Sequence, residues 1–307
     1  MIYTVTFNPA LDYVMHVGNL NAKDINRCES EKIYFGGKGI NVSVILTRLG
    51  VANNALGFLA GFSGKQIESM LKEESVKTDF IYLENGFTRI NVKIKSDKGF
   101  DINASGPEIS EEDAAKLLDK LSVLKKGDYL VLAGSVPKSM PSDIYEKILD
   151  LFSGKGVHFV VDATGDLLRN VLKYKPFLVK PNHHELGELF SAEVEDMADI
   201  VKYSKKLQEM GAVNVLVSWG KNGAVLLDEN GEVYICGNVP GEISGSVGCG
   251  DSMVAGFIAG YEDKGEYSYA LKLGSACGNA TAFAENLASK SEIEKMMQSE
   301  YLNVKHL

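Results

Sequence analysis

The chain has 307 residues, 45% of them hydrophobic and 24% charged, so a sizeable core is available and disorder is not expected. The net charge is −9, and such an acidic surface argues against nucleic acid and anionic membranes as partners. No apolar run approaches membrane-spanning length, no signal peptide is visible, and the four cysteines lack metal-ligand spacing, so we expect reduced thiols in a cytoplasmic protein.

Short apolar runs typical of buried strands alternate with amphipathic, helix-like segments. The strand candidates are Ile2–Phe7, Leu56–Leu59, Tyr129–Leu132, Val157–Val161, Phe177–Val179 and Val213–Val217. Helices are expected after Ser110, Pro141, Asn182 and Glu195, and a hairpin at residues 225–236. Buried strands separated by helices predict a mostly parallel sheet covered on both faces, with ligands beyond the carboxyl ends of its strands.

Residues 13–34 and 87–104 break this alternation, because they are extended and carry no helical period. Polar and apolar residues alternate strictly at positions 89–95, which predicts a sheet with one wet face and one buried face. We therefore expect a small satellite sheet here. The other residues, 1–12, 35–86 and 105–307, are assigned to one α/β core.

The loop Gly36-Gly37-Lys38-Gly39-Ile40-Asn41 opens a helix-like run. Its glycines let a ligand approach the backbone, Lys38 supplies a mobile positive charge, and Asn41 supplies a donor and an acceptor. The spacing does not fit a Walker A loop, and taken alone such a loop is more often a plain turn.

A second loop, Ser246-Val247-Gly248-Cys249-Gly250-Asp251, enters another apolar helical run. Free backbone N–H groups and the positive end of a helix dipole meet at such a place and bind anions, phosphate above all. Asp251 among these amides indicates a base directed at an attacking hydroxyl. A helix cap explains Asp251 equally well in isolation, but the two loops together favour the catalytic interpretation.

With both loops, the sequence resembles the PfkB, or ribokinase-like, family of sugar kinases over essentially its whole length. The matching elements are Thr6–Asp12, Gly36–Asn41, Thr88–Lys93, Lys180–Glu185, Val217–Ala224 and Gly248–Asp251. The chain departs from the family where Cys249 replaces Ala and Trp219 replaces Leu, and neither change removes a required functional group. The resemblance implies a ribokinase-like three-layer α/β/α core with a small β-sheet lid that covers the sugar and often pairs with another subunit.

The resemblance also implies roles for individual residues. Catalysis would fall to Asp251 and to the backbone amides of Gly248, Cys249 and Gly250. A phosphosugar would be bound by Asp12, Gly37, Lys38, Asn41 and Arg89, with Arg27 on the lid as a further contact. ATP would be bound by Asn182, Ser218, Gly220, Gly223, Ser246 and Asn279, and Glu185 would hold Mg²⁺ through water.

Several of these residues also have ordinary structural explanations. Asp12 could cap a turn, Arg89 could be an exposed strand residue, and Asn182 with Glu185 could be an exposed helix start. Asn279 could equally be a core or surface residue. The family pattern favours the functional roles, and a guanidinium such as that of Arg89 matches phosphate oxygens in a bidentate fork.

The implied reaction is the ATP- and Mg²⁺-dependent phosphorylation of fructose 1-phosphate at its 6-hydroxyl, because residues 88–93 are similar to the Thr-Arg-Ile-Asn-Val-Lys run of that branch of the family. Alternatives are a tagatose 6-phosphate kinase, a kinase of an unphosphorylated sugar or nucleoside, and a catalytically silent sugar-phosphate-binding regulator. The intact Asp251 and loop glycines argue against the regulator. The lid also suggests a homodimer.

Two further features involve potential metal or redox chemistry. His183 and His184 have no third ligand at a telling spacing, so no zinc site is expected. Cys249 lies at a helix N-terminus, which favours a reactive thiolate, although the neighbouring Asp251 opposes it.

Overall fold

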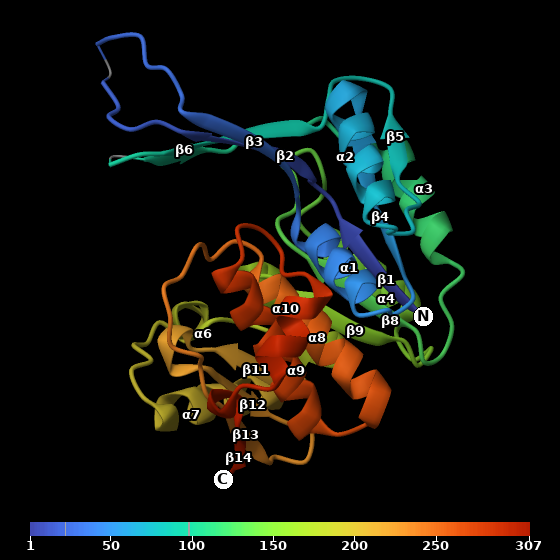
Figure 1. Ribbon diagram of the computed structural model, residues 1–307. Helices are drawn as coiled ribbons and strands as arrows, with labels where there is room; N and C mark the ends of the chain where they lie inside the picture. The colour runs from blue at the N-terminus through green and yellow to red at the C-terminus, as the bar shows by residue number, and fades with distance from the viewer. Residues whose placement is uncertain (22, 98) are drawn as a thin grey trace.

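The main sheet forms the centre of the molecule. The computed structural model describes residues 1–21, 23–97 and 99–307, and in this part the main sheet has ten strands in the order β14-β13-β12-β11-β10-β9-β8-β1-β4-β5. Their bounds are β1 Ile2–Thr6, β4 Asn53–Ala60, β5 Ile81–Leu83, β8 Tyr129–Ala133, β9 His158–Asp162, β10 Leu178–Val179, β11 Asn214–Ser218, β12 Ala224–Leu227, β13 Val233–Cys236 and β14 Val304–His306. In this order, the seven strands from β11 to β5 run parallel to one another, whereas β11, β12, β13 and β14 pair antiparallel. The predicted mostly parallel sheet is therefore confirmed (Figure 1).

Helices cover both faces of this sheet, because its strands send alternate side chains into two buried clusters. In β8, Val131 belongs to one cluster, whereas Leu130 and Leu132 belong to the other. The first cluster includes residues of α1 Lys38–Arg48, α2 Gly61–Glu73, α8 Cys249–Lys264, α9 Tyr267–Phe283 and α10 Lys290–Met297. The second includes residues of α3 Glu111–Leu121, α4 Ile144–Phe152, α5 Gly165–Val171, α6 His183–Phe190 and α7 Met197–Glu209. The three-layer α/β/α core is thereby confirmed. Within the described ranges, no helix is long and apolar enough to cross a membrane.

The elements predicted from the sequence correspond to observed ones, with ends that shift by a few residues. The strand candidates are β1, β4, β8, β9, β10 and β11, and the helix candidates are α3, α4, α6 and α7. The predicted hairpin is β12 with β13, paired from Ala224↔Cys236 to Leu227↔Val233. Strands β5 and β14 were not predicted, because three residues are too few to establish an alternating pattern.

A smaller sheet projects from the core (Figure 1). Among the described residues its strands lie in the order β3-β2-β6-β7, with bounds β2 Ala10–His16, β3 Ser30–Gly36, β6 Arg89–Lys95 and β7 Phe100–Ile102. The register places Tyr13 beside Ile33 and Val92 on an apolar face, whereas Asp12 lies beside Asn91 on the opposite, polar face. The predicted satellite sheet with one polar and one apolar face is therefore present. The expectation that the polar face is wet and the apolar face buried is wrong in part, because Asp12 and Asn91 are buried against the core, whereas Ile33, Phe100 and Ile102 are about half exposed.

The strands of this sheet extend beyond the predicted lid segment 13–34. Strand β2 begins at Ala10 and β3 ends at Gly36, because their ladder continues to the pair Ala10↔Gly36 next to the core. Asp12, which we assigned to the core, is thus a strand residue of the smaller sheet. The division of the chain into a core and a lid stays a prediction.

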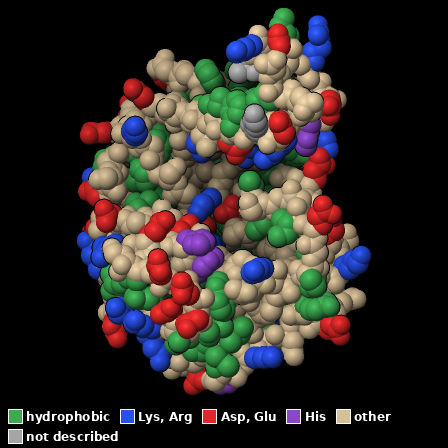
Figure 2. Space-filling view, turned by 90° about the vertical axis from the view of Figure 1, so that its left-hand side faces the viewer, with side chains coloured by type: hydrophobic (Ala, Val, Ile, Leu, Met, Phe, Trp, Pro, Cys, Tyr) green, Lys and Arg blue, Asp and Glu red, His purple; other side chains and the backbone are tan. Residues whose placement is uncertain are grey.

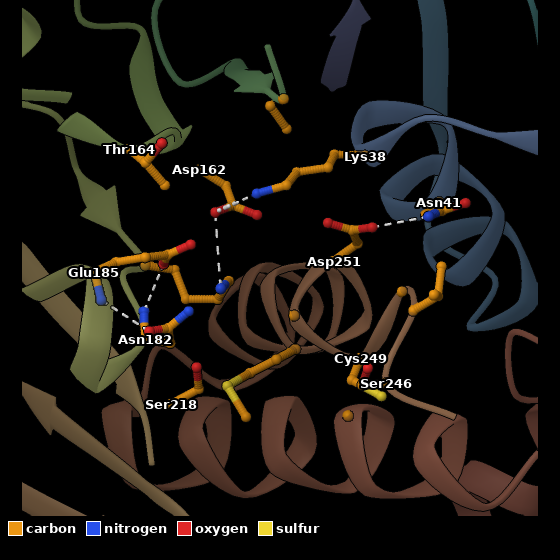
Figure 3. A pocket seen from close by; sticks show the side chains of 18 of the residues that line it. Lys38, Asn41, Asp162, Thr164, Asn182, Glu185, Ser218, Ser246, Cys249 and Asp251 are labelled. Carbon is orange, nitrogen blue, oxygen red and sulfur yellow. Dashed lines mark hydrogen bonds and ion pairs between the residues drawn. The ribbon is translucent and has the colours of Figure 1, made fainter. Parts of the chain in front are cut away.

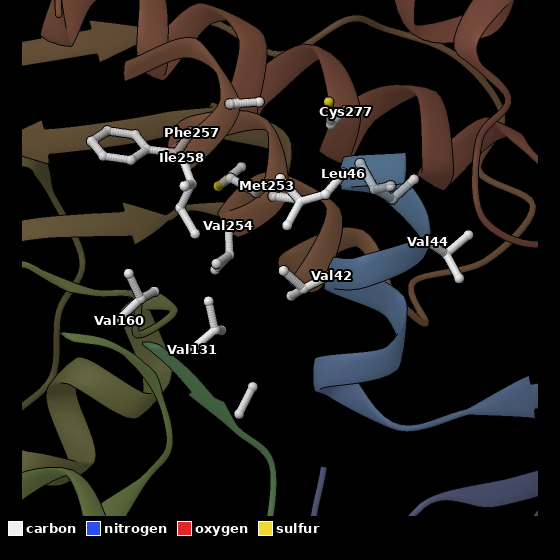
Figure 4. Close-up of a cluster of buried hydrophobic side chains, with 14 of the residues drawn as sticks. Val42, Val44, Leu46, Val131, Val160, Met253, Val254, Phe257, Ile258 and Cys277 are labelled. Carbon is white, nitrogen blue, oxygen red and sulfur yellow. The ribbon is translucent and has the colours of Figure 1, made fainter. Parts of the chain in front are cut away.

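The start of helix α8 is held firmly against the main sheet. Val254 and Ile258 of α8 share a buried apolar cluster with Val131 of β8 and Val160 of β9 (Figure 4). A fully buried side chain of this size contributes about 1.5–3 kcal/mol. This packing fixes the first turn of α8, and with it the loop that carries Asp251.

Candidate active site

A cavity of about 1620 Å³ lies between the main and smaller sheets, with lining residues at the carboxyl ends of several parallel strands. Figure 2 shows the hollowed face of the molecule, with charged side chains of both signs inside the hollow. The predicted site residues that line the cavity are Asp12, Gly37, Lys38, Asn41, Arg89, Asn182, Glu185, Ser218, Gly220, Gly223, Ser246, Gly248, Cys249, Gly250, Asp251 and Asn279. Arg27 is exposed in the connection between β2 and β3 and does not line the cavity, so its role in binding stays a prediction.

Asp251 lies in the first turn of α8 and does not cap it. The N-cap residue is Gly248, and no side chain caps this helix. The Asp251 Oδ2 atom accepts a hydrogen bond of 2.8 Å from Asn41 Nδ2, which comes from the first loop (Figure 3). The interpretation of Asp251 as a helix cap is therefore wrong, and the two loops meet at this carboxylate.

The glycines around Asp251 are required by the backbone and by close neighbours. Gly248 has φ +79°, and a Cβ atom there would lie 2.6 Å from Leu287 Cδ2. A Cβ atom on Gly250 would lie 2.9 Å from Lys180 Nζ. A side chain at Gly248 would strain the left-handed backbone and displace Leu287, whereas one at Gly250 would have to displace the end of the Lys180 side chain. Within this loop the Cys249 N–H donates to Ser246 O at 3.4 Å.

Two lysines and a second carboxylate surround Asp251. Asp162 Oδ1 lies 3.2 Å from Lys38 Nζ and 3.7 Å from Lys180 Nζ, and Asp162 is 2% exposed. Figure 3 shows the Asp251 carboxylate facing the same space as Lys38 and Asp162. Burial alone would lower the pKa of Lys38, but the nearby carboxylates of Asp162, Asp251 and Glu185 outweigh it, so the pKa of Lys38 is raised and the amine stays charged.

The pKa of Asp251 is raised to about 6. Burial is the main cause and the Asp162 carboxylate adds to it, whereas Asn41, Lys38 and Lys180 act in the opposite direction. A carboxylate with such a pKa is mostly ionised at neutral pH, yet more basic than an exposed one. Such a pKa suits a group that acts as a general base near neutral pH.

At the other end of the cavity, Arg89 and Asp12 lie on adjacent strands of the smaller sheet. Arg89 donates from Nε to Asn8 O at 3.1 Å and from Nη1 to Ala104 O at 3.4 Å. Asp12 accepts from Asn91 Nδ2 at 2.8 Å and pairs with Lys93 Nζ at 2.7 Å, so it does not cap a turn. The two tethers fix the Arg89 guanidinium, which has further donors for an anion.

Comparisons with known proteins agree with this geometry. The model of the pfkB family of carbohydrate kinases matches residues 5–294. The chain belongs to this family. It is 45% identical to a 1-phosphofructokinase of Bacillus subtilis, over 97% of each chain. It is 35% identical to a D-tagatose-1-phosphate kinase of Bacillus licheniformis, over 96% of this chain and 97% of that one. Phosphofructokinase-2 of Escherichia coli, solved in complex with substrates and products, has a TM-score of 0.91 at 25% identity, over 96% of this chain and 98% of that one.

Family membership confirms the ribokinase-like fold and the class of sugar kinase. The cavity also contains residues that the sequence analysis did not assign, among them Asp162, Lys180 and Asn91. Asp162 ends β9 and Lys180 directly follows β10. The sequence could have identified these two residues, because both directly follow apolar strand candidates, and ligands were expected beyond the carboxyl ends of those strands.

The part of the cavity for which we predict nucleotide binding is formed by the loops after β11 and before α8, together with α9. Asn279 of α9 is 7% exposed, donates to Ser275 O at 2.8 Å and accepts from Val239 N at 3.0 Å. Its amide therefore anchors the segment at residues 238–241. A direct contact between Asn279 and adenine stays a prediction.

Asn182 and Glu185 form a capping box at the start of α6. Asn182 Oδ1 accepts from Glu185 N at 2.9 Å, and Glu185 Oε2 accepts from Asn182 N at 2.8 Å. Both residues also line the cavity, and Glu185 has a second carboxylate oxygen. No group of three or more His, Cys, Asp or Glu side chains among the described residues could hold a metal directly. These donors fit a Mg²⁺ ion that keeps several waters and contacts Glu185 through one of them.

The expectation of a reactive Cys249 thiolate is wrong. Burial and the Asp251 carboxylate raise the pKa of the Cys249 thiol to about 11, which outweighs its position at a helix N-terminus. We expect iodoacetamide at pH 7.5 to alkylate Cys249 at least about tenfold more slowly than an ordinary cysteine in a peptide, because the thiolate is the nucleophile. Labelling followed by peptide mapping measures the rate, and a rate equal to that of the peptide would contradict the raised pKa.

Proposed function

We propose that this chain is an ATP-dependent kinase that phosphorylates fructose 1-phosphate at its 6-hydroxyl to give fructose 1,6-bisphosphate. The observation that carries the proposal is the buried Asp251, which lies next to the Gly248–Gly250 amides and in contact with Asn41, in one cavity with Arg89. The 45% identity to a 1-phosphofructokinase supports the choice of sugar.

In the proposed mechanism, Arg89 holds the phosphate already on the sugar, and Asp12 with Asn41 orients the ring hydroxyls. Asp251 takes the proton from the 6-hydroxyl, and this oxygen attacks the γ-phosphoryl group of ATP in line, with ADP as the leaving group. The backbone amides of Gly248, Cys249 and Gly250 stabilise the charge on the transferring group. Bound Mg²⁺ would neutralise charge on the nucleotide phosphates, with Glu185 as its contact through water.

A kinase assay across several sugars tests the proposal. We expect the highest kcat/KM for fructose 1-phosphate and a value for tagatose 6-phosphate that is about ten- to ten-thousandfold lower, because one or two ring hydroxyls would be left unpaired. Tagatose 1-phosphate, fructose 6-phosphate and free fructose complete the panel, the first because two relatives are named D-tagatose-1-phosphate kinase. Preference for a tagatose phosphate would change the substrate but not the kinase class. If the protein consumed no ATP with any of these sugars, the result would favour the catalytically silent regulator.

The pH profile provides a separate test of the base. Since the pKa of Asp251 is raised to about 6, we expect kcat/KM to be constant near pH 7–8 and to fall about tenfold per pH unit below about 6, as Asp251 becomes protonated. The Asp162→Asn variant should move this inflection to lower pH, because one cause of the raised pKa is removed. An inflection that does not move would argue against Asp251 as the titrating group.

We also propose that the apolar face of the smaller sheet pairs with the same face on a second copy. The register places Ile33, Ile102 and Phe100 on this face, and they are 50%, 56% and 45% exposed. An apolar sheet face of this kind is normally covered by a partner. Light scattering should give twice the chain mass of 33.4 kDa, and Ile102→Asp should give the single mass. A wild-type monomer, or an unchanged mass in the variant, would contradict the proposal.

A further inference from the structure

The carboxylate of Asp12 is held by two donors from the neighbouring strand. Asn91 Nδ2 donates to Asp12 Oδ1 at 2.8 Å, and Lys93 Nζ lies 2.7 Å from Asp12 Oδ2. The side chains of Asp12 and Lys93 are only 11% and 12% exposed, so water screens this pair weakly. Both oxygens of the carboxylate are thereby fixed in position.

The pairing of β2 with β6 brings these residues together. Asp12 lies opposite Asn91, and Lys93 is two residues further along β6, so its side chain lies on the same face and reaches Asp12 diagonally. Asp12, Asn91 and Arg89 line the cavity, whereas Lys93 does not. In the described part of the chain, Lys93 thus reaches the cavity through its ion pair with Asp12.

The charge of Asp12 creates a difficulty for a phosphorylated substrate. Burial lowers the pKa of Arg89 and the Asp12 carboxylate opposes this, which shows that the two charges lie within electrostatic reach. A phosphate dianion bound at Arg89 would thus be close to a weakly screened carboxylate. The ammonium group of Lys93 lies on the Asp12 oxygen and compensates its charge.

We propose that Lys93 is a positioning residue for the phosphosugar, which orients the Asp12 carboxylate toward the ring hydroxyls and compensates its charge so that a phosphate dianion can bind at Arg89. The inference rests on the proposed function, since it requires a substrate that carries a phosphate and hydroxyl groups. It assigns to the smaller sheet the discrimination in favour of phosphorylated sugars.

The test compares Lys93→Met, Lys93→Arg and, as a matched control, Lys95→Met. Lys95 is on the same strand and face but is exposed. In Lys93→Met we expect the KM for the phosphosugar to rise about tenfold or more, with kcat changed by less than about threefold and the KM for ATP nearly unchanged. Lys93→Arg should return the sugar KM to within about threefold of wild type, because it restores the charge and a donor. The control should behave as wild type.

Several outcomes would overturn the proposal. These are an unchanged sugar KM in Lys93→Met, a failure of Lys93→Arg to restore it, or an equal rise in the ATP KM, which would indicate a general structural effect. If thermal melting shows that Lys93→Met is unfolded, Lys93→Gln takes its place: it retains a neutral donor but loses the charge, so the KM for the phosphosugar should still rise by at least about threefold, and an unchanged value would overturn the charge compensation.

The wild-type protein separates this inference from the proposed function. The proposed function fails if the wild type uses no phosphosugar. If it uses a ketohexose phosphate other than fructose 1-phosphate, the same variants are measured with that sugar. The inference about Lys93 is then judged by the ratio of the sugar KM in each variant to that in the wild type.

Discussion

Asp251→Asn is expected to lower turnover by about 10²–10⁴-fold, which is the usual effect of removing a positioned general base. The substitution keeps the size and shape of the side chain. Its amide oxygen can still accept the hydrogen bond that Asn41 Nδ2 donates at 2.8 Å, so the contact between the two loops should survive. The loss should therefore appear in kcat, with ATP binding nearly unchanged.

The measurement combines steady-state kinetics, in which one substrate is varied while the other is saturating, with a titration of ATP binding. Trp219 is the one tryptophan of the chain and lies between Ser218 and Gly220, so its fluorescence can report nucleotide binding in both proteins. Asp263→Asn, an exposed position near the other end of α8, is the matched control and should keep normal turnover. Near-normal turnover by Asp251→Asn would show that another group accepts the proton.

Local pattern in the sequence predicts the elements and the loops of this protein because their causes are local. Alternation at residues 89–95 reflects the two faces of β6, and short apolar runs reflect strands buried on both sides. The loop around Asp251 was identified for a similar reason, since small residues before an apolar helical run open backbone amides wherever they occur.

The environment of the same residues could not be predicted, because it depends on which strands become neighbours. Asp162 meets Lys180 only because β9 and β10 are adjacent in the sheet. Lys93 meets Asp12 only because β2 pairs in parallel with a strand some eighty residues later. Cys249 is a further example. The sequence alone shows that it lies at a helix N-terminus, but the burial that raises the pKa of its thiol depends on the packing of distant segments.

Arg89→Ala is expected to raise the KM for the phosphosugar at least about tenfold, because a charge-assisted contact to phosphate contributes about 1.5–3 kcal/mol. The structure strengthens this expectation. The contacts of Nε with Asn8 O and of Nη1 with Ala104 O hold the guanidinium in place before a substrate arrives, so little side-chain entropy is lost on binding. The KM for ATP should stay nearly constant, because Arg89 belongs to the smaller sheet.

The conservative variant separates charge from geometry at this position. Arg89→Lys keeps the positive charge but loses the planar fork and the two backbone tethers, so its sugar KM should lie between those of wild type and Arg89→Ala. The three proteins are compared by initial rates at saturating ATP and then at saturating phosphosugar. If the KM for ATP rose in place of that for the sugar, Arg89 would belong to the nucleotide side. The sugar phosphate would then not bind near Asp12, and the charge compensation inferred for Lys93 would not be needed.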